Sequence, residues 1–128
     1  MKQVFDQLEK IQFDHALWVN ELTYAIIEIE LYQNRVISLL EENLGQKVEE
    51  KLLALFENFE KKKELVNEIK LNIRIHHINN SKLVSSNGNI QKMVNIDHQK
   101  TEKEMEDFRN GLKKLKEDFN RFLILNGI

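Results

Sequence analysis

Four histidines, at positions 15, 76, 77 and 98, are the side chains of this sequence best suited to chemistry. His15, His76 and His98 each fall on an apolar repeat in which the spacing alternates between 4 and 3 residues. Neutral imidazole nitrogens bind Zn²⁺ and Fe, so three of them brought to one level would form a metal site. Neighbouring side chains that could assist as further ligands or as hydrogen-bond partners are Asp14, His77, Asp97 and Glu102.

These histidines can meet only if long helices bring them together. Apolar residues recur every 4 and 3 positions along three stretches, which predicts amphipathic helices, and no proline interrupts them. Turn signals stand at Asn43–Gly45 and at Ser85–Asn89, and Gly45 suits a left-handed residue at the end of a helix. The sequence therefore predicts one domain, 1–128, with helices at about 4–43, 46–83 and 89–126. Residues 4–13 either continue the first helix or form a short separate one, and the unbroken apolar repeat favours continuation.

Short turns make consecutive long helices antiparallel. Pairing the first two helices about Gly45 places Tyr32 opposite Phe59 and His15 opposite His76. Pairing the second and third about Asn87 places His76 opposite His98, so the three histidines share one layer. The predicted fold class is all-α, an antiparallel bundle of three long helices with coiled-coil-like heptad packing.

Charged residues beside the apolar repeats support this pairing. Three pairs are predicted between the first two helices: Glu21 with Lys70, Glu28 with Lys63, and Glu30 with Lys61. One layer contains Lys62, whose amine either reaches out beside Glu28 or Glu30 or forms a buried ion pair that fixes the register.

A second apolar set flanks the main repeats, and dimerisation that doubles the bundle would cover it. Its members are Ile26, Leu40, Leu53, Phe56, Leu65 and Leu123. Self-association or a protein partner is therefore expected.

The histidine layer allows several interpretations. It is a polar core layer that fixes the register, a solvent-facing cluster, a Zn or Fe site, or a pH-responsive joint, because an ordinary imidazole titrates near pH 6.5. The main expectation is a non-catalytic structural or protein-interaction bundle. The alternative is a metal-binding bundle whose ligands are His15, His76 and His98.

Composition narrows the function further. The 19 basic and 21 acidic residues give a net charge of −2, which does not favour nucleic acid or anionic lipid as a partner. The chain has no cysteine for thiolate chemistry or disulfides, and no apolar run long enough for a bilayer. Phosphate-loop, zinc-protease and nucleophile-elbow motifs are absent from the sequence. A cytoplasmic protein that is not an enzyme and has no certain cofactor is expected.

Three strings carry a family resemblance: Trp18-Val19-Asn20-Glu21-Leu22, Tyr32-Gln33-Asn34-Arg35-Val36 and Asp118-Phe119-Asn120-Arg121-Phe122-Leu123. They resemble strings in small uncharacterised helical-bundle proteins of Bacteroidetes-type bacteria. The resemblance covers these three strings and implies a soluble bacterial helix bundle, with no particular chemistry attached.

Overall fold

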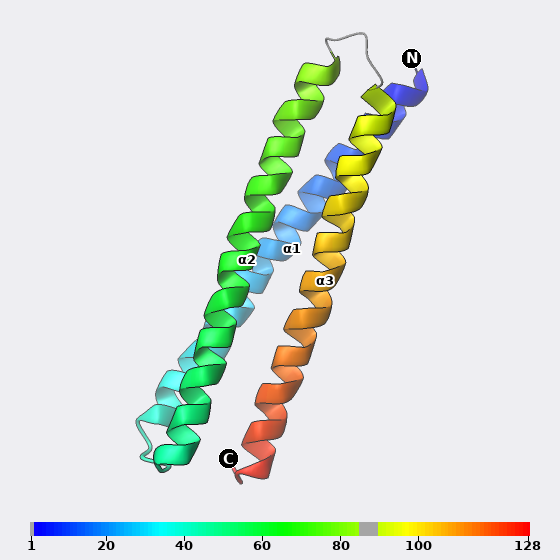
Figure 1. Ribbon diagram of the computed structural model, residues 1–128. Coiled ribbons are helices and arrows are strands. Elements are labelled where there is room, and N and C mark those ends of the chain that lie inside the picture. The colour runs from blue at the N-terminus through cyan, green and yellow to red at the C-terminus, as the bar shows by residue number, and fades with distance from the viewer. Residues whose placement is uncertain (1, 85–89) are drawn as a thin grey trace.

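The computed structural model describes the backbone of residues 2–84 and 90–128 and the side chains of residues 6–79 and 97–128. Three long helices lie side by side: α1 (Lys2–Leu40), α2 (Gln46–Val84) and α3 (Ile90–Leu125). The first and third run in the same direction and the second runs against them, with the two chain ends at opposite ends of the bundle (Figure 1). The antiparallel three-helix bundle is therefore confirmed, and residues 4–13 do continue the first helix.

The core consists of the predicted apolar repeats. Leu22, Ile69 and Met105 are fully buried, one on each helix, and Val36 and Leu52 are equally inaccessible. Residues recurring every 3 and 4 positions share one side of a helix, so each helix presents one continuous apolar side to the other two. Removal of this surface from water is what holds such long, thin helices together.

An aromatic cluster shows that the predicted register is correct. The Tyr32 ring stacks on Phe59 with centroids 5.1 Å apart, and Phe119 meets both rings edge-on at 5.3 and 6.0 Å. Stacked and edge-to-face contacts of this kind stabilise beyond the area that they bury. The three rings come from the three helices, so this one layer fixes the height of every helix relative to the others.

The first connection contains two left-handed residues. The structure places Asn43 at φ 54° and Gly45 at φ 103°, between the end of α1 at Leu40 and the start of α2 at Gln46. Gly45 is left-handed as predicted, but it precedes α2 instead of ending α1, and its carbonyl accepts the Glu49 N–H at 3.0 Å. The second predicted turn, Ser85–Asn89, lies outside the described residues.

All three predicted charge pairs are corrected by the structure. Lys63 approaches Glu30 at 3.9 Å, so Glu30 has Lys63 as its neighbour in place of Lys61. Glu21 and Glu28 lie on the flank of α1 that faces α3. Arg109 donates to Glu21 at 2.8 Å, and Lys116 donates to Glu28 at 2.7 Å. Lys70, the predicted partner of Glu21, instead donates to the Thr23 hydroxyl at 3.0 Å.

These contacts form part of a ladder between α1 and α3. The acidic residues Asp14, Glu21 and Glu28 are spaced seven apart, and each meets a base of α3: His98, Arg109 or Lys116. We refer to these three contacts as the acid–base ladder. The contacts of Glu21 with Arg109 and of Glu28 with Lys116 are solvent-accessible and contribute about 0–1 kcal/mol each, so these two orient α3 on α1 more than they stabilise the bundle.

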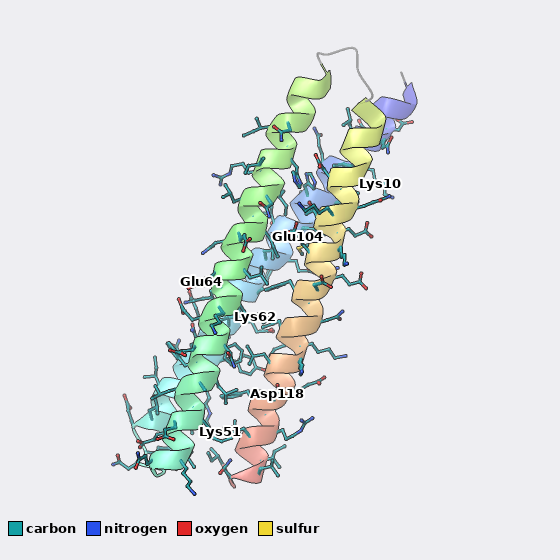
Figure 2. The ribbon with its side chains drawn as sticks, viewed as in Figure 1. Lys10, Lys51, Lys62, Glu64, Glu104 and Asp118 are labelled. Atoms are coloured by element: carbon teal, nitrogen blue, oxygen red, sulfur yellow. The ribbon has the colours of Figure 1, made fainter. Side chains whose placement is uncertain are left out.

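The lysine within the core is accommodated by a glycine. Lys62 is half-buried on α2 (Figure 2), and its Nζ lies 2.7 Å from where a Cβ on Gly111 would be. The missing side chain of Gly111 thus leaves room for the ammonium group. Both carboxylates predicted to receive Lys62 have other lysines, Lys116 at Glu28 and Lys63 at Glu30.

The second apolar set is mostly covered by the bundle itself. Leu53 is 53% exposed, whereas the other five members lie partly buried against the core: Ile26, Leu40, Phe56, Leu65 and Leu123. This set therefore gives little reason for a second copy. Over the described part of the chain, none of the helices has a stretch long and apolar enough to cross a bilayer.

Candidate functional site

The predicted histidine layer is the most polar part of the core. On α1 His15 comes after Lys10, and on α3 His98 comes before Glu104; Figure 2 labels Lys10 and Glu104. The rings of His15 and His98 have centroids 5.9 Å apart, and Trp18 contacts both, tilted against His15 at 5.6 Å and stacked on His98 at 5.0 Å. The predicted meeting of α1 and α3 histidines is therefore observed, and Trp18 joins them.

Asp14 orients the ring of His98. The His98 Nε2 atom lies 3.1 Å from Asp14 Oδ2, and both side chains are largely shielded from solvent. An N–H at Nε2 donates to the carboxylate, which leaves Nδ1 of the neutral ring as an acceptor. That Nδ1 atom is buried and has no hydrogen-bond partner. A histidine held by a carboxylate, with its second nitrogen free, has the form of an oriented ligand.

His76 is held by a hydroxyl. Its Nδ1 atom lies 2.9 Å from Thr101 Oγ1, and the Thr101 hydroxyl donates to the backbone carbonyl of Asp97 at 3.0 Å. Since the single hydroxyl proton goes to that carbonyl, the Thr101 oxygen accepts from an N–H at Nδ1 of His76. His76 is thus bound to α3 one turn beyond His98.

His15 is the most deeply buried titratable group of the layer. The side chain is 6% exposed, and neither ring nitrogen has a hydrogen-bond partner. Burial, together with the nearby His98, His76 and His77 rings, lowers the pKa of His15 to about 4, against an opposing effect of Asp14. An unpartnered polar group at this depth costs free energy, and burial of a charged ring would cost more. The His15 ring therefore stays neutral at pH 7.

The structure assembles the predicted ligand set only in part. His15, His98 and Asp14 come together, His76 is engaged by Thr101, and Asp97 contributes its carbonyl. His77 and Glu102 are exposed. Within residues 6–79 and 97–128, no group of three or more His, Asp or Glu side chains is placed to hold a metal ion. The three-histidine metal site stays a prediction.

A second surface was missed from the sequence. Along the outside of α1, five large apolar side chains are between 50% and 73% exposed: Phe13, Leu17, Tyr24, Ile27 and Leu31. Together with Asn20 they repeat at spacings of 4, 3, 4, 3 and 4, and we refer to these six residues as the outer stripe. The signal was present as a second heptad pattern on the first helix.

The outer stripe borders a groove between α1 and α3 of about 500 Å³. Tyr24, Ile27 and Leu31 line its α1 side, and Phe108 and Leu112 reach it from α3. Two contacts of the acid–base ladder, Glu21 with Arg109 and Glu28 with Lys116, lie along the same groove. The exposed apolar surface is therefore continuous with the edge of the core.

Comparisons with models of protein families, with curated proteins and with solved structures gave no match. The resemblance carried by the three strings of the sequence stays a prediction.

Proposed function

We propose that this chain is a non-catalytic bundle that binds protein through the outer stripe of α1. The observation that carries the proposal is the exposure of its five large apolar side chains, from Leu17 at 50% to Tyr24 at 73%. Contiguous apolar surface of this kind is a mark of interaction sites, because single exposed residues are common but rows of them are not.

The spacing of the outer stripe indicates the kind of partner. Residues at alternating steps of 3 and 4 form one straight row on a helix, which is the pattern that packs against a second helix. The groove beside Tyr24 and Leu31 gives such a helix a concave edge. A protein that offers an amphipathic helix is the best-supported partner. The lack of cysteine is compatible with the cytoplasm as the place where they meet.

The experiment compares three baits in quantitative affinity capture from the source cells. The double variant Leu17→Glu/Ile27→Glu places charge in the outer stripe, and Leu71→Glu, at a residue 52% exposed on α2, is the matched control. A partner is expected with wild type and with Leu71→Glu, and at least a tenfold loss is expected with the double variant. The partner must then bind in purified form with the same dependence. Equal capture by all three baits would contradict the proposal.

Metal binding is the second candidate function. It is supported by the buried, unpartnered nitrogens of His15 and His98 and by the Asp14 carboxylate that orients the His98 ring. A third imidazole would come from His76 after its ring leaves Thr101. Zn²⁺ and Fe²⁺ are the metals to test, because imidazole nitrogen suits both.

Elemental mass spectrometry on untagged protein, dialysed after addition of Zn²⁺ or Fe²⁺, tests this candidate. One metal per chain is expected, with its loss in His98→Ala and in His76→Ala. His77→Ala removes an exposed imidazole and should retain most of the metal. Failure of wild type to retain metal, or equal losses in all three variants, would reject the site.

A further inference from the structure

The spacing of the outer stripe is the same from either end, as a two-fold symmetric contact between two identical helices requires. We infer that the outer stripe binds the outer stripe of a second copy of this chain, with the two α1 helices antiparallel. The inference rests on the proposed function and specifies the partner. Steps of 4, 3, 4, 3 and 4 read the same in both directions, so the row is complementary to itself when one copy is turned end to end.

One register pairs all six positions. In it Phe13 of one copy faces Leu31 of the other, Leu17 faces Ile27, and Asn20 faces Tyr24. Each pair occurs twice, because the two-fold axis that relates the two copies generates a second, identical pair. The four outer pairs are wholly apolar, and the two central ones place the amide of Asn20 against the only hydroxyl of the stripe. That amide can therefore hydrogen-bond on burial.

Other registers are excluded by polar residues. A shift of one heptad in one direction places Asn20 opposite Leu17 and Lys10 opposite Ile27, and a shift in the other places Asn34 opposite Leu17. Each shift buries a polar group against an aliphatic side chain, which costs free energy. In the inferred register the polar ends of the row meet each other, with Lys10 opposite Asn34.

Charge beside the stripe does not oppose the pairing. Two copies in this register bring Glu21 near Glu21 and Asp14 near Glu28. Like charges would repel, but each of these carboxylates already meets a base of α3 in the acid–base ladder. On the other flank Thr23 is bound by Lys70, and Glu30 is approached by Lys63. The carboxylates on both flanks thus have partners within each copy: a lysine or arginine at Glu21, Glu28 and Glu30, and the His98 ring N–H at Asp14.

The surface is large enough for a reversible dimer. Five large side chains that are half to three-quarters exposed would remove on the order of 500 Å² per copy, or about 1,000 Å² in total. A total of that size lies at the lower end of specific interfaces, so the monomer and dimer should exchange with concentration.

Sedimentation velocity from about 1 to 500 μM is the first experiment. We expect wild type and Leu71→Glu to shift from one to two chains across that range, and Leu17→Glu/Ile27→Glu to stay monomeric with unchanged helix content. A monomeric wild type at the highest concentration would overturn the second copy as occupant. Affinity capture that still depends on the stripe would in that case leave the proposed function standing.

Cysteine cross-linking tests the orientation, and the chain has no cysteine of its own to interfere. A mixture of Leu17→Cys and Ile27→Cys chains should form mixed disulfides at least tenfold faster than either variant does alone. A parallel pair would make Leu17→Cys cross-link with itself, and that result would overturn the inference. A mixture of Leu71→Cys and Ile27→Cys serves as the matched control for random collision and for binding of α1 to α2.

Discussion

At the scale of single residues, the histidines show that one side-chain type takes three states within one layer. His98 is oriented by a carboxylate, His76 by a hydroxyl, and His15 by contact with rings alone. Both ring nitrogens of His15 lack a hydrogen-bond partner, and burial lowers the pKa of His15. The three rings share one layer and still differ in what holds each of them.

Replacing His15 with Leu tests this directly. The folded-state pKa of His15 is about 4 and the ordinary value is 6.5. Between pH 6.5 and 4, position 15 is therefore protonated in the unfolded chain but not in the folded one. Wild type should lose up to about 3 kcal/mol of stability as the pH falls from 6.5 to 4, and His15→Leu should not lose that part. At pH 7 the variant should be more stable by about 1 kcal/mol, since an unpartnered polar group has gone.

Urea unfolding of both proteins at several pH values between 4 and 7.5 measures the difference. Titration of carboxylates is common to both chains and cancels in the comparison. Parallel pH profiles for wild type and His15→Leu would show that the His15 ring is not held neutral.

Gly111 and Lys62 form a second residue-scale test. A methyl group at position 111 would meet the Lys62 ammonium group, which is the free end of a flexible side chain and can move. Gly111→Ala should therefore stabilise the protein by about 0.5–1 kcal/mol, the usual gain for alanine within a helix. In a Lys62→Ala background the gain should be at least as large. Urea denaturation of the four chains checks this, and a loss of stability confined to the Lys62 background would mean that the ammonium group cannot relocate.

The convergence of the histidines could be predicted from sequence, but their bonding could not. Register alone places His15 level with His98, because it depends only on where the apolar repeats stand. Which nitrogen of His76 bonds, and to what, depends on ring rotation and on Thr101, which lies one turn further along α3. Sequence spacing does not encode rotamers, so the hydrogen-bond partners of the rings follow only from the structure.

At the scale of elements, the apolar spacing predicts the helices and their register, but it does not predict which flank of a helix faces which neighbour. The register of a hairpin is the same whichever side the third helix packs on, so Tyr32 and Phe59 were paired correctly. The partners of Glu21 and Glu28 depend on which flank of α1 faces α3, and the apolar pattern leaves that handedness open. This is why both were assigned to α2 when their bases, Arg109 and Lys116, lie on α3.

The connection between α1 and α2 depends on backbone conformation. Gly45 adopts a positive φ of 103°, and nothing lies within 4 Å of where a Cβ would stand. Gly45→Ala should therefore cost about 1–2 kcal/mol through backbone strain alone, without any steric clash. Asn43→Gly is the matched control: Asn43 already has φ 54°, and glycine there should change stability by less than about 0.5 kcal/mol. Thermal unfolding followed by circular dichroism compares the two, and equal effects would contradict the assignment of strain to Gly45.

At the scale of the whole molecule, the continuous core should make the bundle unfold as one unit. Trp18 reports on the histidine layer, and Phe59 lies in the aromatic layer, about 20 Å away at 1.5 Å per residue along α1. Phe59→Leu should lower stability by about 1–2 kcal/mol through lost ring contacts. The shift in urea midpoint should be the same by Trp18 fluorescence and by circular dichroism. A shift seen only by circular dichroism would show that the two ends unfold separately.

The parallel course of α1 and α3 has an electrical consequence. Peptide dipoles add along a helix, and α2, running the other way, cancels the dipole of only one neighbour. Each bundle therefore retains the backbone dipole of about one helix, equivalent to about half a unit charge at either end. In two copies joined antiparallel through α1 the net backbone dipoles of the two bundles would cancel, whereas in a parallel pair they would add. Transient electric birefringence, which aligns rods by their dipoles, would then distinguish the two assemblies without any change to the sequence.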